Sequence, residues 1–427
     1  MTGVTEMDGM FKRVYGSDVV RAVPQVHRLA NDIKFVPDAQ REGDTFNIPV
    51  LLTREHGHSF NLDGSAFTLG GAFSDQSKNA QLNSAEYVLQ VQLSYGAMQK
   101  ATGKGPKAFA NATKHKVKAA VEASSFVREI ELLYGGGSSP DTSATGAIDN
   151  LGEVLSVADG GTGDGSFVIT AASWSTAIWS GLEGAQLDVH DSDGTHRNPT
   201  AAVVVSSVDP STRTISVTGT ESELDAIAAG DYVRLAGART KEMVGACRVA
   251  SHTSGTLHNI NASTYQLWQG NSFAVGGALT FAKVMQGLNR PTSLGYQGDD
   301  MTVYVPVAAW QDINEDQAAL RRYTSSAGGE LSQGAEELCF YGQTGKVKIV
   351  PHIFMKQVNA LALPTSKCMR VGATDTTFEM PDGQGKIFRQ LDTKAGVEFR
   401  AYWNQSFFTA HPSYMTLYTG ISSSGDL

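Results

Sequence analysis

The chain has 427 residues, of which 41% are hydrophobic and 18% charged, so it is long enough for two or three domains with cores of their own and is not disordered throughout. Its formal net charge of -9 argues against a protein that coats nucleic acid, because such a protein would be broadly basic. The 3 cysteines lie far apart, which indicates neither a disulfide framework nor a zinc site and fits a reducing compartment. No stretch is long and apolar enough to span a membrane, and the first residues lack a signal-peptide core, so we expect a cytosolic protein without a membrane partner.

The first hundred or so residues read as an arm followed by two strands. Residues 1–42 mix short amphipathic pieces with charges and prolines, which indicates an extended N-terminal arm. Alternating apolar residues predict a strand at 46–52, and Pro49 demotes it to a sheet edge or a bulge. A cleaner alternation predicts a second strand at 87–95. We expect these two strands to pair as a hairpin within residues 43–98, with a connecting loop long enough to be functional.

The connecting loop carries apolar side chains that lack local packing partners. We interpret them as a contact surface, because isolated apolar groups gain nothing from exposure to water. They are Phe60, Leu62, Phe67, Leu69 and Phe73. The histidines on either side of Gly57 are more often exposed than metal-binding at this spacing.

Residues 106–134 predict one very long helix, which Pro106 begins and three glycines at 135–137 end. At 1.5 Å per residue it would be roughly 40 Å long, so it must lie across something large. Small and apolar residues recur along one side at three-and-four spacing, and we expect that side to be covered. They are Thr113, Val117, Ala120, Ser124, Val127, Ile130 and Tyr134.

The charges of this helix oppose its dipole, at a cost of at most about 0.3–1 kcal/mol per terminal charge. The lysines crowd its beginning: Lys104, Lys107, Lys114, Lys116 and Lys118. The glutamates sit toward its end: Glu122, Glu129 and Glu131. Two interpretations stay open, a solvated basic face and a surface that meets a negatively charged partner.

The composition changes at residues 151–238, where short β-rich runs alternate with Gly, Asp, Ser and Pro. This pattern predicts a separate small barrel or sandwich, with one turn at 209–212. Beyond it, the sequence predicts a helix at 279–288 that Pro291 ends, and a strand at 301–307 that runs into a helix. Further strands are expected at 346–355, 378–383 and 397–408. The expected fold class is α+β with an inserted β module.

A search for reactive chemistry finds no catalytic motif. The glycine-rich runs at 160–165 and 342–346 miss the spacing of nucleotide-binding loops and are interpreted as turns. Cys247 is interpreted as a core residue. The best metal candidate is DVHDSDGTH at 188–196, yet it lacks the register of a calcium loop, and a polar hairpin turn is favoured. We therefore predict no catalytic residue, no metal and no cofactor.

This order of arm, hairpin with a long loop, long helix and mixed domain resembles the major capsid proteins of tailed bacteriophages, whose coat fold is named after phage Hong Kong ninety-seven. The phrases GDTFNIPVLL, GDYVRLAGARTKEMVG, STYQLWQGN, LTFAKVMQGL and YVPVAAWQDI look like those of coat proteins with an inserted β-barrel. The resemblance implies five parts: an N-terminal arm (1–42), an extended β-hairpin loop (43–98), a spine helix with part of the peripheral domain (99–150), an inserted β-barrel-like domain (151–238), and an axial domain with the rest of the peripheral domain (239–427).

The resemblance implies a structural role without enzymatic activity. Copies of the chain would assemble as hexamers and pentamers into an icosahedral head shell around double-stranded DNA. Scaffolding, portal and decoration proteins are further partners of this family, and the packaged DNA would be contacted weakly. The chain would be assembled in the host cytoplasm and end in the virion. The loop tip would contact a neighbouring subunit, and the lysines of the spine helix would face the DNA or an acidic neighbour.

Three other functions remain open. An encapsulin-like compartment has the same shell fold. A carbohydrate-binding surface protein would use Trp174, Trp179 and Trp268 as stacking platforms for sugars. A hydrolase would use 188–196 as its metal centre.

Overall fold

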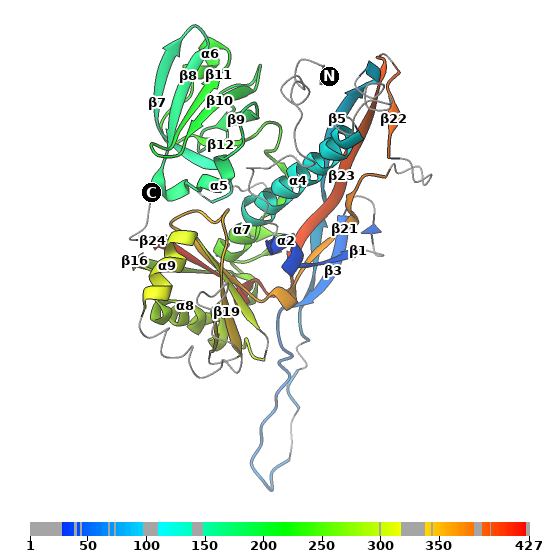
Figure 1. Ribbon diagram of the computed structural model, residues 1–427. Coiled ribbons are helices and arrows are strands. Elements are labelled where there is room, and N and C mark those ends of the chain that lie inside the picture. The colour runs from blue at the N-terminus through cyan, green and yellow to red at the C-terminus, as the bar shows by residue number, and fades with distance from the viewer. Residues whose placement is uncertain are drawn as a thin grey trace, which may run out of the picture.

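The computed structural model in Figure 1 shows a mixed α+β protein rich in strands, which confirms the expected fold class at that level. It describes residues 28–37, 41–42, 45–66, 69–71, 74–96, 110–138, 148–298, 300–316, 338–342, 345–379, 387–392 and 394–423. No helix among these residues is long and apolar enough to cross a membrane.

A five-stranded sheet carries the long helix on one face (Figure 1). Its strands are β1 (Lys34–Pro37), β5 (Ala85–Ser94), β21 (Cys368–Thr377), β22 (Arg389–Gln390) and β23 (Gly396–Thr409). The helix is α4 (Ala110–Tyr134), and a short helix, α2 (Arg28–Asp32), precedes β1. Tyr87 of β5 stacks on Trp403 of β23 with ring centroids 5.2 Å apart. The alternating apolar side chains of β5 therefore pack inside this chain.

The predicted pairing between the strands at 46–52 and 87–95 is wrong. The strand β3 (Thr45–Leu51) pairs along its whole length with β4 (Ser77–Asn83), and β5 pairs with β23 instead. The sequence of β4 is mostly polar, and only its residues Ala80 and Leu82 are buried. A two-residue strand, β2 (Arg41–Glu42), reaches only the start of β3, so Pro49 faces a side without a strand among the described residues. The long loop is therefore 52–76.

Six strands between Gly152 and Leu235 close into a barrel in the order β10-β11-β8-β7-β12-β9. They are β7 (Gly152–Gly161), β8 (Asp164–Ile169), β9 (Gln186–His190), β10 (Val203–Asp209), β11 (Thr214–Thr218) and β12 (Tyr232–Leu235), with η1 (Ala171–Ser173), α5 (Thr176–Trp179) and α6 (Glu221–Leu224) between them. Inward-facing Val, Ile, Leu and Phe side chains fill the barrel. Trp174 and Trp179 stack on each other and are buried, as is Trp268, so none of them can serve as a platform for sugars.

A six-stranded sheet forms the remaining body, with α8 (Phe281–Ser293) and α9 (Val307–Glu315) on one face. Its order is β16 (Asn271–Gly277), β24 (Thr416–Ile421), β20 (Ala360–Leu363), β17 (Met301–Val305), β19 (Lys346–Pro351) and β18 (Leu338–Tyr341). Both faces are covered, which explains why every residue of β17 is buried. The smaller elements are β14 (Thr256–Leu257), β15 (Ile260–Asn261), η2 (Gln266–Trp268), η3 (Thr365–Lys367) and η4 (Pro412–Tyr414).

Two expectations for this region need correction. The helix α8 continues through Pro291 to Ser293. The carbonyl that Pro291 leaves without an N–H donor belongs to Gly287, and the Thr416 hydroxyl donates to it at 3.2 Å. The expected strand at 378–383 is absent from its described part, since β21 ends at Thr377.

The segments that lead into and out of the barrel region lie side by side. The strand β6 (Gly136–Ser138) follows α4, and it pairs with β13 (Lys241–Val244), which precedes α7 (Ala246–Ser251). At Gly135 a Cβ atom would lie 2.1 Å from the Met243 carbonyl oxygen. The glycines after α4 therefore also permit this close backbone approach.

Part of the predicted N-terminal arm, residues 1–42, belongs to the body of the molecule. Residues 28–37 pack into the body, where β1 pairs in parallel with β21 and Leu29, Ala30 and Ile33 are buried. Residues 1–27 lie outside the described residues.

Candidate functional site

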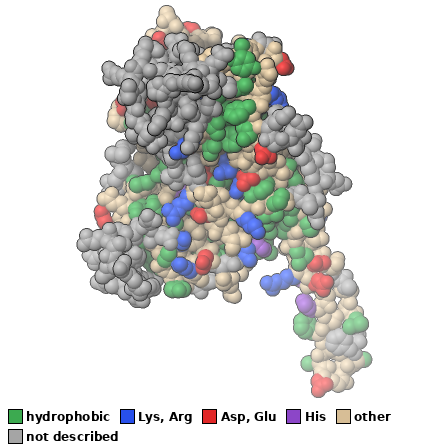
Figure 2. All heavy atoms as spheres, turned by 45° about the vertical axis from the view of Figure 1, so that its right-hand side comes forward, with side chains coloured by type: hydrophobic (Ala, Val, Ile, Leu, Met, Phe, Trp, Pro, Cys, Tyr) green, Lys and Arg blue, Asp and Glu red, His purple; other side chains and the backbone are tan. Residues whose placement is uncertain are grey.

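The loop 52–76 projects from the body of the molecule and presents apolar side chains (Figures 1 and 2). Phe60 is 92% exposed, Leu62 83% and Leu69 79%. The two other residues predicted for this surface, Phe67 and Phe73, lie outside the described residues. Folding of a single chain therefore leaves this apolar area in water.

Hydrogen bonds within the loop give its tip a defined shape. The Asn61 side-chain amide donates to the Ser65 carbonyl oxygen at 3.0 Å, and the Gly70 N–H donates to Ser59 Oγ at 2.7 Å. His56 and His58 are exposed, and neither belongs to a group of three metal-ligating side chains among the described residues. The tip is thus a shaped apolar surface.

The base of the loop is anchored on the body. Phe46 of β3 and Leu82 of β4 face each other across the hairpin and are fully buried. The Tyr265 hydroxyl donates to Gln76 Oε1 at 2.7 Å, which ties the end of the loop to the segment after β15. A fixed base aims the exposed tip in one direction (Figure 1).

The basic half of α4 is described only in part. Lys104 and Lys107 lie outside the described residues, as does the side chain of Lys114. Lys116 is half-buried and Lys118 is exposed. Lys116 and Lys118 are therefore at least partly accessible to solvent in the N-terminal half of α4.

Two of the three glutamates of α4, Glu129 and Glu131, are buried, and Glu122 is half-buried. Glu129 is completely buried, and its carboxylate accepts hydrogen bonds from the N–H groups of Leu29 at 2.7 Å and Ala30 at 3.0 Å. His352 Nε2, from the segment after β19, lies 2.8 Å from the same carboxylate. One side chain thus joins α2, α4 and the six-stranded sheet, and these bonds offset its unfavourable position in the helix dipole.

A buried ionic cluster lies where the barrel meets α4. Arg234 of β12 approaches Asp149 and Glu242 at 3.4 Å each. Glu131 of α4 lies beside them. Burial raises the pKa of Glu131 well above its usual range, and repulsion from Glu242 raises it further. The uncharged form of Glu131 is therefore favoured at this site.

Lys356 extends this cluster toward the six-stranded sheet. Its Nζ donates to Asn150 Oδ1 at 3.1 Å and lies 4.7 Å from the centroid of the Tyr134 ring. Burial lowers the pKa of Lys356 to about 8. The Ser175 hydroxyl, beside α5, donates to the Ile353 carbonyl oxygen at 2.8 Å. The barrel is thus held on the body by polar contacts from several elements.

The predicted hairpin at 188–196 is confirmed as a turn between β9 and a bridge at His196. The rings of His190 and His196 stack with centroids 4.4 Å apart, and His196 Nε2 lies 3.5 Å from Asp188 Oδ1. Burial lowers the pKa of His190 to about 4. These side chains form no group of three ligands within 4.8 Å among the described residues. Including Asp191 and Asp193 does not give such a group of three ligands either.

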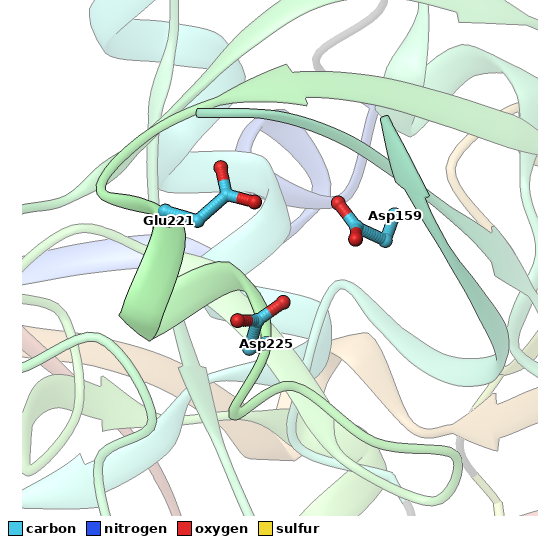
Figure 3. Close-up of side chains that lie close together, drawn as sticks. All are labelled: Asp159, Glu221 and Asp225. Atoms are coloured by element: carbon cyan, nitrogen blue, oxygen red, sulfur yellow. The ribbon is translucent and has the colours of Figure 1, made fainter. Parts of the chain in front are cut away.

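One acidic group does meet that distance criterion. Figure 3 shows Asp159, Glu221 and Asp225 close together, each with a carboxylate oxygen within 4.8 Å of the others. Glu221 begins α6, which lies at the end of the barrel away from the six-stranded sheet (Figure 1). Glu221 also accepts a hydrogen bond from the Gly163 N–H. Asp159 and Asp225 are exposed, and no other feature of the site indicates a bound ion.

Two of the three cysteines, Cys247 and Cys368, are buried, and Cys339 is half-buried. Burial raises the pKa of Cys247 and that of Cys368 to about 12. The interpretation of Cys247 as a core residue is confirmed, since it is fully buried.

No family model matches the chain, and no curated protein matches it. Solved phage structures do match it, among them two cyanophage capsids. A chain of the capsid asymmetric unit of cyanophage A-1(L) aligns with a TM-score of 0.52 and 9% identity, covering 96% of this chain and 97% of its own. A chain of the capsid of cyanophage P-SCSP1u aligns with a TM-score of 0.50 and 9% identity, covering 99% and 96%. At this identity the likeness concerns the fold, and over nearly its whole length the chain has the fold of these phage capsid chains.

Proposed function

We propose that the chain is the structural major capsid protein of a tailed phage and assembles into an icosahedral shell around double-stranded DNA. The observation that carries the proposal is the fold shared with phage capsid chains over nearly the full length. The proposed role is architectural.

The loop 52–76 supplies a contact between copies. Its tip offers Phe60, Leu62 and Leu69 to solvent, and its base is fixed, so a neighbouring copy can cover it without a large loss of conformational entropy. Phe67 and Phe73 belong to the same proposed surface. A closed shell repeats each contact many times, so a small apolar patch is sufficient.

The basic half of α4 faces the packaged DNA or an acidic neighbour. Lys118 is exposed and Lys116 half-buried, while Glu129 and Glu131, which would repel DNA, are buried in the body. Lys104, Lys107 and Lys114 complete the proposed basic surface. Such contacts are weak and salt-dependent.

Hexamers and pentamers of the chain form the proposed shell. Scaffolding, portal and decoration proteins are its further partners, DNA is contacted weakly, and assembly in the host cytoplasm delivers the chain to the virion. The domain boundaries implied by the family resemblance belong to the same proposal.

Expression of the chain alone, followed by negative-stain electron microscopy of the fraction of highest mass, tests the proposal. Closed shells, tubes or capsomer rings are expected. A uniform monomer that stays monomeric when the other head proteins are co-expressed would contradict it. Shells that enclose a protein cargo and no DNA in the native host would favour an encapsulin-like compartment.

A further inference from the structure

The net charge of the chain is concentrated in the barrel region. Residues 151–238 hold twelve Asp and Glu, three Arg and no Lys, which is a net charge of -9 and equals that of the whole chain. The rest of the chain is therefore electrically balanced, although it is almost four times longer. This partition was not apparent from the overall composition.

The three arginines of the barrel are all engaged in the structure. Arg234 is buried in the ionic cluster at the junction. Arg197 pairs with Asp231, with Nε and Oδ2 3.1 Å apart. Arg213 Nε donates to the Ile169 carbonyl oxygen at 3.4 Å. The positive charges of the module thus serve its own fold and its attachment.

Half of the twelve acidic side chains, in contrast, are exposed. The exposed ones are Asp159, Asp164, Glu183, Asp193, Asp209 and Asp225. Several of them, with Glu221, lie at the end around α6, which points away from the six-stranded sheet (Figures 1 and 3). A solvent-facing surface of one sign repels other polyanions within about 8 Å at physiological salt.

The module is also held in one position. Arg234 ties β12 to Asp149 and Glu242, the Ser175 hydroxyl bonds to Ile353, and Gln357 donates to the Trp174 carbonyl oxygen at 3.1 Å. Contacts from both ends of the inserted segment and from α5 prevent it from swinging freely about a single linker. Its acidic surface therefore has a fixed direction relative to α4.

We infer that the barrel module, residues 152–235, stands on the outer face of the shell, with its acidic end in solvent and away from the DNA. This inference rests on the proposed function. Packaged DNA lies against the inner wall, where a surface with a net charge of -9 in every copy would be repelled, whereas the lysines of α4 would be attracted. On the outside, like charges keep neighbouring modules apart.

Thiol labelling of DNA-filled particles tests the inference. Cys247 and Cys368 are buried, so replacing the half-buried Cys339 by Ser leaves a low background. One variant adds Ser222→Cys on α6, and a matched variant adds Lys118→Cys on α4; both positions are exposed in the single chain. Intact, nuclease-treated particles are treated with a maleimide coupled to a polymer too large to enter the shell, and the same particles are treated again after disruption.

We expect Ser222→Cys to be modified to the same extent before and after disruption, and Lys118→Cys only after it. Protection of Ser222→Cys in intact particles, with modification after disruption, would overturn the inference. Absence of particles in electron micrographs of both variants and of the native chain would instead contradict the proposed capsid function, so the two failures are distinguishable.

Discussion

The C-terminal half of α4 and the tip of the 52–76 loop use polar and apolar side chains in opposite ways. In α4, the carboxyl groups of Glu129 and Glu131 are buried and have their hydrogen-bond partners within the same chain. In the loop, Phe60 and Leu62 are exposed, and the ring contact of Phe60 is with His58 of the loop itself, with centroids 6.4 Å apart. The difference separates folding from assembly: changes in the first region act on the single chain, and changes in the second act on contacts between copies.

The largest effect on the single chain is expected from Glu129→Ala. The substitution leaves His352 and the N–H groups of Leu29 and Ala30 buried without their acceptor, so the free energy of unfolding should fall by about 3–5 kcal/mol. Denaturant unfolding measures this change. Lys118→Ala on the exposed side of the same helix should alter it by less than about 0.5 kcal/mol. Equal effects of the two variants would show that Glu129 does not fasten α2.

A change of opposite sign is expected from Glu131→Gln. Because burial raises the pKa of Glu131, the folded state holds a proton that the unfolded chain releases above about pH 4.5, and stability falls as the pH rises from there toward the folded pKa. The amide lacks this cost and can still accept from the Met243 N–H, which lies 3.4 Å from Glu131 Oε2. The variant should therefore be more stable near pH 7, by about 1.4 kcal/mol per unit of pKa shift.

The free energies of unfolding of the native chain and of Glu131→Gln should converge near pH 4, because Glu131 is mostly protonated there in both the folded and the unfolded native chain. A stability gap that is the same at pH 4 and pH 7 would mean that titration of Glu131 is not its cause. Thermal melts across this pH range, compared at each pH with the native chain, provide the measurement.

A smaller effect on the single chain, with a large effect on assembly, is expected from the double variant Phe60→Ser and Leu62→Ser. Both side chains are exposed, so the free energy of unfolding should change by less than about 0.5 kcal/mol. The yield of shells, counted in electron micrographs, should fall strongly. Asp63→Ser, a polar change at the same tip, should preserve the yield; normal shells from the double variant would remove the loop tip from the proposed contact.

The smallest effect on folding is expected from Lys116→Glu combined with Lys118→Glu. The monomer should unfold as the native chain does, while the fraction of particles that contain DNA should decrease. Lys78→Glu combined with Lys34→Glu, at exposed positions of β4 and β1, is the matched control for an added pair of negative charges. Equal DNA content in both variants would favour a solvated basic face without a DNA partner.

The sequence by itself determined the long helix with its glycine stop and the turn-rich character of 151–238, and it showed no catalytic motif. These features depend on local periodicity and turn chemistry, which are written into consecutive residues. It also exposed the reversed charges of α4. It did not reveal which charged side chains are buried. Glu129 and Lys118 belong to the same amphipathic pattern, and the pattern does not show that one is buried and the other exposed.

Only the tertiary structure decided the partners. The pairing of β3 with the polar strand β4, and of β5 with a strand some three hundred residues later, joins segments whose local patterns do not identify each other. The ionic cluster of Arg234, Asp149 and Glu242 likewise exists only because the chain returns beside itself at β6 and β13. Long-range contacts of this kind are selected by the energy of the whole packed core, which no short window of sequence contains.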